Sequence, residues 1–389
     1  MSGTTQPGPI SPADGPVAVT GSGGYIGSHI VLNLVKHGYT VRACVRDAGK
    51  LSNTAHLTAM NHIGPGTVTL HECDMTIPGA YDEVFSGCSG VFHAAAEMGN
   101  LEGSTPLKVY EGGLEATKLV IDSIKKAGTV KRLVYTSSFS AVGHPCDDNH
   151  VHTEECTSDM NQDMRREGAT WDMETVQHNR EIAYAMTKLE AERYVYAVAK
   201  RNGFAAFGVC PAHVIGPLLA ASHARPWCWQ TRIGDMLEGY SHARMFWNIV
   251  DVRDVAETQR LIAESPDNKN GERYNLVATD QSGMITQIEL QEILQRLYPD
   301  KGIGGIYRDG KWRMHPKSVL EKPISQLGLK PHTVEQTVRD NADSLIAWGL
   351  VQTRDGEDNW QREGKDLGIK SKWSPSAYPA MDPRTKASA

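Results

Sequence analysis

The chain has 389 residues, of which 40% are hydrophobic and 22% are charged, and its formal net charge is −6. This composition is typical of a soluble globular protein, and the negative charge argues against binding to nucleic acid or to an anionic membrane surface. Small-molecule partners are therefore favoured. The length fits a single large α/β unit with a subsidiary lobe as readily as two independent domains.

The cysteines and the chain start bear on the compartment. The seven cysteines are scattered and form no CxxC pair, so they indicate neither a disulfide framework nor a zinc ribbon, and a reducing compartment fits best. Residues 1–14 lack a charged segment followed by an apolar run, and no later stretch approaches the length of a membrane span. We expect a cytoplasmic protein with a flexible leader at 1–14.

The first elements alternate between strands and helices. Residues 17–20 (VAVT) are short and apolar enough for a buried strand, and apolar residues then recur at helical spacing until Gly38. Further strands are expected in "YTVRACVR", "TVTLHECD" and "GVFHAAA", with the amphipathic "YDEVFSGC" between the last two.

The same order recurs twice more. A helix through "LEATKLVIDSIKKAG" leads to the strand "RLVYTSS", and "AYAMTKLEAERYVYAVAKRNG" leads to "FAAFGVCPA". Gly128 and Gly203 stand where helix C-caps are expected. This alternation predicts a parallel sheet covered by helices on both faces, which is the doubly wound α/β (Rossmann) architecture.

The alternation ends after the last of these strands. We expect residues 15–211 to form the dinucleotide-binding domain, with 246–264 returning to it. Residues 212–245 and 265–352 are expected to form a smaller substrate-binding lobe that closes over the cofactor. The polar, breaker-rich segment 353–389 predicts an extension or a disordered tail.

Three glycines, Gly21, Gly24 and Gly27, fall between the first strand and its helix in "TGSGGYIG". One permits a tight turn, another lets backbone approach a pyrophosphate, and a third allows close packing of helix on sheet, while the helix N-terminus offers N–H groups to the anion. At the first strand–helix junction of an alternating chain this spacing predicts a dinucleotide site, to which Tyr25 and Ile26 also belong.

The ends of the second and third strands bear on the choice of cofactor. Arg46 favours NADP(H), because the planar donor fork of arginine makes paired charge-assisted bonds to a 2′-phosphate. Asp47 follows it and either pairs with Arg46 or favours the unphosphorylated ribose of NAD(H). Asp74, followed by Met75, is placed to accept from the adenine amino group, unless it is an ordinary strand-end turn residue.

Tyr184 stands four places before Lys188 in "EIAYAMTKLEAE". On a helix the two side chains share one face, close enough for the ammonium to act on the phenol. The pattern alone is weak, since an ordinary solvated helix face also produces it.

The chain resembles the extended short-chain dehydrogenase/reductase family, and within it the dihydroflavonol reductase and cinnamoyl-CoA reductase-like branch, which includes fungal aldehyde and ketone reductases. Weaker echoes, "NIVDVRDVA" and "GERYNLVA", carry the resemblance to about residue 280. Its main motifs follow one another between about residues 16 and 217: "VTGSGGYIGSHIV", "GYTVRACVRD", "GAYDEVFSGCSGVFHAAA", "VKRLVYTSS", "TEECTSDM", "YAMTK" and "PAHVIGP".

The resemblance implies roles for these residues. In the family the tyrosine protonates the carbonyl oxygen, the lysine holds the nicotinamide ribose and a serine after the fifth strand polarises the carbonyl; here these are Tyr184, Lys188 and Ser138, with Ser137 structural or touching cofactor. The lysine cation stabilises a phenolate whose free pKa is ~10, and serine and tyrosine donate to the developing oxyanion. The nicotinamide half is implied to be lined by apolar strand-end residues, unless these are merely core: Ala94, Ala95, Ala96, Pro211 and Val214.

Two departures bear on the substrate. Gly143 stands where flavonoid-specific members have an asparagine, and "EIAYAMTK" differs from the NWYCYGK of cinnamoyl-CoA reductases, so a general aldehyde or ketone reductase is expected. The longer segment 161–182 is interpreted either as a rim of the pocket or as a surface elaboration.

Aromatic residues in the expected lobe form either a wall that accepts an aromatic substrate or simply lobe core: Trp227, Trp229, Phe246 and Trp247. Position after strand ends adds further candidates, so that the predicted substrate-binding residues are Met98, His144, His213 and Trp227.

Rival hypotheses are a metal site, other enzymes of the fold and a sensor. Metal ligation needs convergent geometry, which a polar loop alone does not indicate, and no metal is expected. An NAD-dependent hydroxysteroid-type dehydrogenase or a sugar epimerase uses the same catalytic residues, and a non-catalytic NADPH-binding sensor stays open. We predict an NADPH-dependent carbonyl reductase, monomer or homodimer, acting on a small-molecule carbonyl. The loop considered for metal contains His144, Cys146, Asp147, Asp148, His150 and His152.

Overall fold

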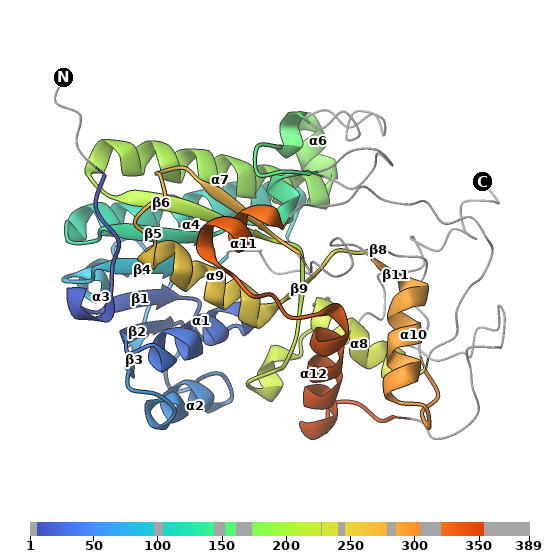
Figure 1. The fold of residues 1–389 in the computed structure, drawn as a ribbon. Helices are drawn as coiled ribbons and strands as arrows, with labels where there is room; N and C mark the ends of the chain where they lie inside the picture. The colour runs from blue at the N-terminus through green and yellow to red at the C-terminus, as the bar shows by residue number, and fades with distance from the viewer. Residues whose placement is uncertain are drawn as a thin grey trace.

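A seven-stranded parallel sheet forms the centre of the computed structural model, with the strand order β10-β6-β5-β4-β1-β2-β3 (Figure 1). The structure describes residues 6–96, 104–143, 152–160, 173–226, 228–239, 246–277, 285–303 and 320–353. The strands are β1 (Val17–Thr20), β2 (Thr40–Val45), β3 (Thr67–Glu72), β4 (Gly90–His93), β5 (Arg132–Thr136), β6 (Ala205–Pro211) and β10 (Arg273–Leu276). The order reverses between β1 and β4, where doubly wound sheets bind dinucleotides, and it confirms the predicted fold.

Helices cover both faces of this sheet. One face carries α1 (Tyr25–Lys36), α2 (Leu51–Ala59) and α9 (Val252–Glu264), and the other carries α3 (Asp82–Phe85), α4 (Pro106–Ala127) and α7 (Arg180–Asn202). Each layer has its own apolar cluster against the strands. Short helical turns complete the framework: η1 (Pro12–Asp14), η2 (Met60–His62), η3 (Phe139–Ala141), η4 (Ser158–Met160) and α6 (Met173–His178).

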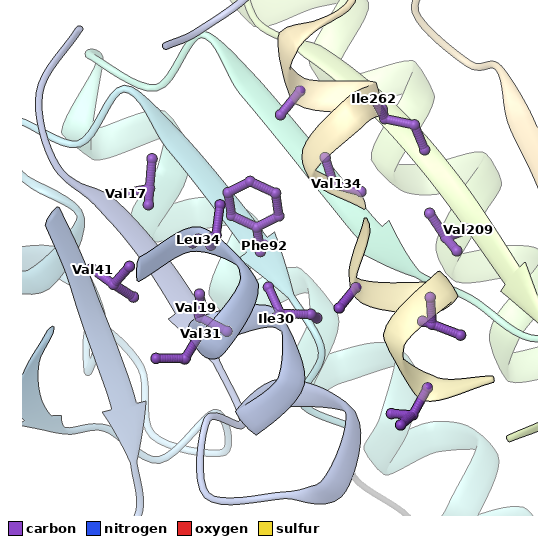
Figure 2. Packing of buried hydrophobic residues seen from close by; sticks show 14 of the residues in the cluster. Val17, Val19, Ile30, Val31, Leu34, Val41, Phe92, Val134, Val209 and Ile262 are labelled. Atoms are coloured by element: carbon purple, nitrogen blue, oxygen red, sulfur yellow. The ribbon is translucent and has the colours of Figure 1, made fainter. Parts of the chain in front are cut away.

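Figure 2 shows the first of these clusters from close by. Ile30 and Leu34 of α1 and Ile262 of α9 pack with Phe92 and Val134 of the central strands, and all five are buried. Burying such a side chain fully contributes about 1.5–3 kcal/mol each. This packing fixes where α1 begins, and therefore where the glycine turn lies.

The predicted helix ends are confirmed for the two long helices. Gly128 follows α4 with φ 64° and Gly203 follows α7 with φ 74°. Both are in the left-handed region, which glycine adopts without a Cβ clash.

The expectation of a flexible leader at 1–14 is wrong for residues 6–14. Ile10 is 2% exposed and its N–H donates to the carbonyl oxygen of Ala263 at 3.0 Å. Gly90 makes room for it, since a Cβ there would lie 2.4 Å from Cδ1 of Ile10. The gap between β4 and α9 is thus filled by an apolar side chain that the sequence pattern left outside any element.

The expected lobe range 265–352 also needs correction. β10 (Arg273–Leu276) pairs with β6 and forms the edge of the main sheet, and α11 (Glu321–Leu327) packs against β10 and α9. Without β10 the edge of β6 would present unpaired backbone groups. A strand of only four residues far from its partner in sequence gave no alternation to reveal this pairing.

The remaining described elements form the smaller lobe. β7 (His213–Ile215) pairs with β9 (Ile249–Asp251), β8 (Phe246–Trp247) pairs with β11 (Ile285–Thr286), and an apolar cluster joins them to the lobe helices. None of the described helices has the length and apolar character needed to cross a membrane. The lobe helices are α8 (Trp229–Leu237), α10 (Gln287–Leu297) and α12 (Val334–Ala347), and η5 (Ala221–His223) lies between β7 and α8.

Candidate active site

The glycine turn follows β1 at the carboxyl edge of the sheet. Gly21 has φ 69°, and a Cβ there would lie 2.8 Å from the backbone nitrogen of Ala95. A Cβ on Gly27 would lie 2.2 Å from the carbonyl oxygen of Gly21. Gly24 is the N-cap of α1, so the first N–H groups of the helix point out of this turn. Glycine at both positions therefore lets these backbone segments pack closely, and the turn with the free N–H groups of α1 has the form of an anion cradle.

The side chains of Tyr25 and Ile26 are engaged with the protein. The Tyr25 hydroxyl donates to the carbonyl oxygen of Gly216 at 2.8 Å, which joins the turn to the chain after β7. Ile26 packs against the apolar cluster on the face of the sheet that carries α1, α2 and α9. Both side chains are half-buried in these contacts.

Arg46 and Asp47 follow β2, and both are exposed. Oδ1 of Asp47 accepts from the backbone N–H of Lys50 at 3.1 Å, so this carboxylate closes its own turn. In the part of the chain that the structure describes, no ion pair joins Arg46 to Asp47. The guanidinium of Arg46 is thus available to a phosphate, whereas Asp47 has a local structural use.

Asp74 and Met75 follow β3. Oδ1 of Asp74 accepts from the backbone N–H of Thr76 at 2.9 Å and from its hydroxyl at 2.7 Å. These bonds, together with the charge of Arg46, hold the pKa of Asp74 below its usual value. Met75 is buried in the apolar cluster of the α3–α4–α7 face. Asp74 is thus a fixed carboxylate beside Arg46.

Tyr184 and Lys188 lie on α7, whose start is set by Asn179. The Asn179 side chain accepts from the N–H groups of Glu181 and Ile182 at 3.0 and 3.1 Å. This N-cap places Tyr184 in the second turn and Lys188 one turn later, where its Nζ lies 5.9 Å from the Tyr184 ring centroid.

Lys188 is almost completely buried. Its side chain is 6% exposed, and Nζ donates to the carbonyl oxygen of Thr136 at the end of β5, at 3.0 Å. Burial by itself lowers the pKa of Lys188, but Tyr135, Tyr184 and Glu192 outweigh that effect, and the pKa lies above its usual value. A permanent cation therefore lies beside the Tyr184 phenol.

Ser138 follows β5 and caps η3. Its Oγ accepts from the N–H of Ser140 at 3.2 Å, and η3 contacts α7. Ser137, by contrast, is buried, and its N–H donates to the carbonyl oxygen of Val209 at 2.8 Å. The half-buried Ser138 hydroxyl thus keeps its own hydrogen for another acceptor, on the side of α7.

His93, at the end of β4, was not among the predicted site residues. It is fully buried, and Nδ1 lies 2.7 Å from the hydroxyl of Thr20, which also accepts from the N–H of Ala95 at 3.1 Å. Burial, with the nearby Lys188 charge, lowers the pKa of His93 to about 3. This neutral ring links β1 to the segment beneath Gly21. In the sequence, the feature that indicates His93 is a histidine at the end of the apolar run "GVFH".

The apolar residues implied for the nicotinamide half lie at the carboxyl ends of strands. Ala94 and Ala95 are half-buried and Ala96 is exposed, directly after β4. Pro211 ends β6, and Val214 in β7 is buried in the apolar cluster on the face that carries α1, α2 and α9. β4 and β6 flank β5, so the residues at the ends of these two strands lie on either side of the strand end that carries Ser138.

A buried ion pair also escaped the sequence prediction. Glu192, one turn beyond Lys188, lies with Oε2 2.7 Å from Nε of Arg273 on β10. Nη1 of Arg273 donates to the carbonyl oxygen of Cys156 at 2.7 Å, which fastens the "TEEC" segment to the sheet edge. A Cβ at Gly208 would lie 2.1 Å from the hydroxyl of Tyr196, so the small residue in β6 leaves space for this cluster.

Trp229, one residue of the expected aromatic wall, stacks on the ring of His213. The rings of His213 and Trp229 lie 3.4 Å apart between centroids at 17°, and Cζ of Arg232 lies 3.8 Å from the centroid of Trp229. Burial, with Arg232, lowers the pKa of His213 to about 3. Trp247 is fully buried in the lobe cluster, so for this residue the alternative interpretation as lobe core is the right one.

Several predicted positions cannot be placed. Met98, His144 and Trp227 lie outside the described residues, as do 161–172 of the longer segment. The loop considered for metal lies mostly outside them too, and within the described chain no group of three His, Cys, Asp or Glu residues could hold a metal ion.

Comparison with known proteins defines the class. The model of the NAD dependent epimerase/dehydratase family matches residues 17–276, and the chain belongs to that family, the extended short-chain dehydrogenases/reductases. Cinnamoyl-CoA reductase 1 of Arabidopsis thaliana is 30% identical over 364 residues, covering 92% of this chain and 97% of the relative.

Other relatives confirm the branch that the motifs indicated. Bifunctional dihydroflavonol 4-reductase/flavanone 4-reductase of Malus domestica is 29% identical and covers 86% of this chain and 91% of its own length. Gre2 of Candida albicans, solved in complex with NADPH, has a TM-score of 0.72 at 22% identity and covers 86% of this chain and 99% of its own. Alfalfa vestitone reductase has a TM-score of 0.66 at 22% identity and covers 87% and 100%. At such identities the solved structures show a shared fold.

Proposed function

We propose that this protein is an NADPH-dependent reductase that converts a small-molecule aldehyde or ketone to the alcohol. The observation that carries the proposal is the buried, charged Lys188 one turn from Tyr184, beside the strand end that bears Ser138. The reductase names of the curated relatives support it.

The residues present fit a dinucleotide. The cradle at Gly21 and Gly27 and the N–H groups at the start of α1 would hold the pyrophosphate. Arg46 would pair with the 2′-phosphate, Asp74 and Met75 would border the adenine, and Lys188 would hold the nicotinamide ribose. The nicotinamide half would be bordered by Ala94, Ala95, Ala96, Pro211 and Val214.

The preference for NADPH over NADH is inferred from the contacts of Asp47, Asp74 and Arg46. Asp47 accepts from Lys50 and Asp74 accepts from Thr76, so each carboxylate is held by its own turn, and among the described residues no ion pair joins either of them to Arg46. An exposed guanidinium at this position attracts a phosphate and gains little from a ribose hydroxyl. Asp47, the residue that favoured NADH in the sequence, is occupied by its own turn.

When bound, NADPH supplies the hydride. The chain supplies the proton and the stabilisation of charge on the carbonyl oxygen. Tyr184 donates its phenolic proton to that oxygen, and the cation of Lys188 stabilises the phenolate that results. Ser138 accepts from Ser140, which leaves its own O–H to donate to the same oxygen as negative charge develops.

The test is consumption of cofactor by the purified protein. NADPH and NADH are compared across aromatic aldehydes, aliphatic aldehydes and ketones, with Tyr184→Phe measured beside the wild type. We expect turnover with NADPH and a fall of about 10²–10⁴-fold in the variant, which keeps the ring but lacks the proton. If no carbonyl is consumed with either cofactor although the protein is folded, the reductase proposal is wrong, and epimerase activity is the next assay.

A further inference from the structure

Two thiols lie together at the ends of β2 and β3. Cys44 on β2 is in register with His71 on β3, so Cys73 is its diagonal neighbour, two residues further along the same face of the sheet. The N–H of Cys73 donates to the carbonyl oxygen of Val45 at 2.8 Å, which ties the two strand ends together. Both side chains lie in the apolar cluster under α3.

The two thiols are not equivalent. Cys44 is 1% exposed, whereas Cys73, beyond the end of β3, is 7% exposed. A hydrogen bond from the Cys44 thiol lowers the pKa of Cys73, while burial raises the pKa of Cys44 well above its usual value. Sγ of Cys44 also lies 3.8 Å from the carbonyl oxygen of Arg42. Cys73 is therefore the thiol of the pair that is more exposed and that ionises more readily, and thiolates are the reactive form.

The pair lies beneath the end of the site assigned to the adenosine 2′-phosphate. Cys73 directly precedes Asp74, and Cys44 is two residues before Arg46. All four groups act electrostatically on the buried Tyr81, which stacks on Phe85 at 5.1 Å between ring centroids. Cys44 and Cys73 therefore share their strand ends with Arg46 and Asp74, the two side chains assigned to the cofactor.

We propose that Cys44 and Cys73 form a reversible disulfide when a hydroperoxide oxidises the protein, and that this disulfide weakens binding of NADPH. The effect on binding rests on the proposed cofactor. The Cys73 thiolate attacks one oxygen of hydrogen peroxide, the O–O bond breaks, and a sulfenic acid forms as hydroxide leaves and takes up the proton that the Cys73 thiol released, giving water. The Cys44 sulfur then attacks the sulfenic sulfur, the S–O bond breaks, and the Cys44 proton leaves with the hydroxide as a second water.

The geometry explains why the bond would disturb the site. Parallel strands lie about 4.8 Å apart and two residues along a strand span about 6.6 Å, so diagonal neighbours have Cα atoms about 8 Å apart, whereas a disulfide usually spans about 4.4–6.8 Å between Cα atoms. Closing the bond draws the end of β3 toward β2. Asp74 and Arg46, at the ends of these strands, are displaced from the positions that face the nucleotide.

The experiment uses the reduced, cofactor-free full chain and hydrogen peroxide. Free thiols are alkylated under denaturing conditions and the linked peptides are identified by mass spectrometry, while NADPH is titrated by fluorescence on the same samples. We expect a link between Cys44 and Cys73 and a rise of about tenfold or more in the Kd for NADPH, reversed by dithiothreitol.

Matched variants assign the effect. Cys44→Ala and, independently, Cys73→Ala should bind NADPH like the reduced wild type and keep that Kd after peroxide. Cys88→Ala removes a third buried thiol of the same cluster, whose Sγ donates to the carbonyl oxygen of Val84, and should still form the link.

Two results overturn the inference: peroxide produces no link between Cys44 and Cys73, or the link forms and the Kd for NADPH does not change. A reduced protein that binds no NADPH contradicts the proposed cofactor and, with it, the effect on binding. The mass readout still decides in that case whether the disulfide forms.

Discussion

The two sides of the candidate site use charge in opposite ways. On the adenosine side, Arg46 is exposed and Asp74 half-buried, at the ends of β2 and β3. On the catalytic side, Lys188 and Glu192 are almost completely buried on α7, and Arg273 meets Glu192 from β10. Exposed charges act singly and are screened by salt, whereas buried charges depend on one another because each is costly without its partner. Substitutions on the catalytic side should therefore have the larger effects.

The largest expected effect comes from Lys188→Met, which has nearly the same length and no charge. The Tyr184 phenolate loses its cation, and we expect kcat/KM for carbonyl reduction to fall about 10²–10⁴-fold. Steady-state kinetics with NADPH measure it. Lys200→Met, at the C-terminal end of the same helix and exposed, is the control and should retain activity.

A fall of less than tenfold in Lys188→Met would contradict the assigned role of this buried cation. It would also remove the main difference between the two sides of the site.

Glu192→Gln tests the mutual dependence of the buried charges. It leaves Arg273 without its counter-charge in the interior, and we expect the free energy of unfolding to fall by about 3–5 kcal/mol. Chemical denaturation measures the change. Arg193→Gln is the control on the next residue: Arg193 is 52% exposed and pairs with Asp159 at 2.7 Å, so its loss should cost about 1 kcal/mol or less.

The double variant Glu192→Leu with Arg273→Met sharpens the same point. Removing both charges leaves neither member of this ion pair without its partner, so most of the stability lost in Glu192→Gln should return. If the double variant is as unstable as Glu192→Gln, packing or the bond from Arg273 to Cys156 governs stability there, and the electrostatic explanation is wrong.

Arg46→Gln tests the exposed side. Loss of the guanidinium should raise the Kd for NADPH about tenfold or more, while the Kd for NADH changes little, because only NADPH carries the 2′-phosphate. The wild-type preference for NADPH should also weaken as salt is raised. Equal losses for both cofactors would show that Arg46 does not recognise the phosphate.

On both sides of the candidate site, the residues that the sequence could propose are close together along the chain. The glycine turn, Arg46 and Asp74 are local in sequence, because a strand end and the next helix start fix them. Tyr184 and Lys188 were visible for the same reason, as residues four apart on one helix.

What the sequence did not reveal depends on contacts between distant segments. Glu192 meets Arg273 only because β10 pairs with β6, and β10 is a four-residue strand with no alternating pattern of its own. The hydrogen bond and the lowered pKa of His93 depend on Thr20 and Lys188, which the sheet and α7 bring close to it in space. Ile10, likewise, fills a gap that exists only after β4 and α9 have packed. Patterns within one element cannot contain such information.

The smallest expected effect concerns His332, whose burial is intermediate between that of the exposed and the buried charges of the site. His332, before α12, is half-buried, and its Nδ1 lies 2.6 Å from Oδ1 of the buried Asp254 on α9. The hydrogen bond with Asp254 raises the pKa of His332 above its usual value of about 6.5. The protonated histidine thus binds its partner better in the folded state, and the stability gained is fully present below about pH 6.5 and is lost as pH rises through the raised pKa.

His332→Gln should therefore lower the free energy of unfolding by about 1 kcal/mol at pH 6 and by progressively less as the pH is raised. Denaturation of both proteins at several pH values measures this. His37→Gln removes an exposed histidine whose Nδ1 lies 2.8 Å from the carbonyl oxygen of Asn33, and it is the control. A difference between wild type and His332→Gln that grows with pH would mean that the neutral ring is the form that stabilises the contact.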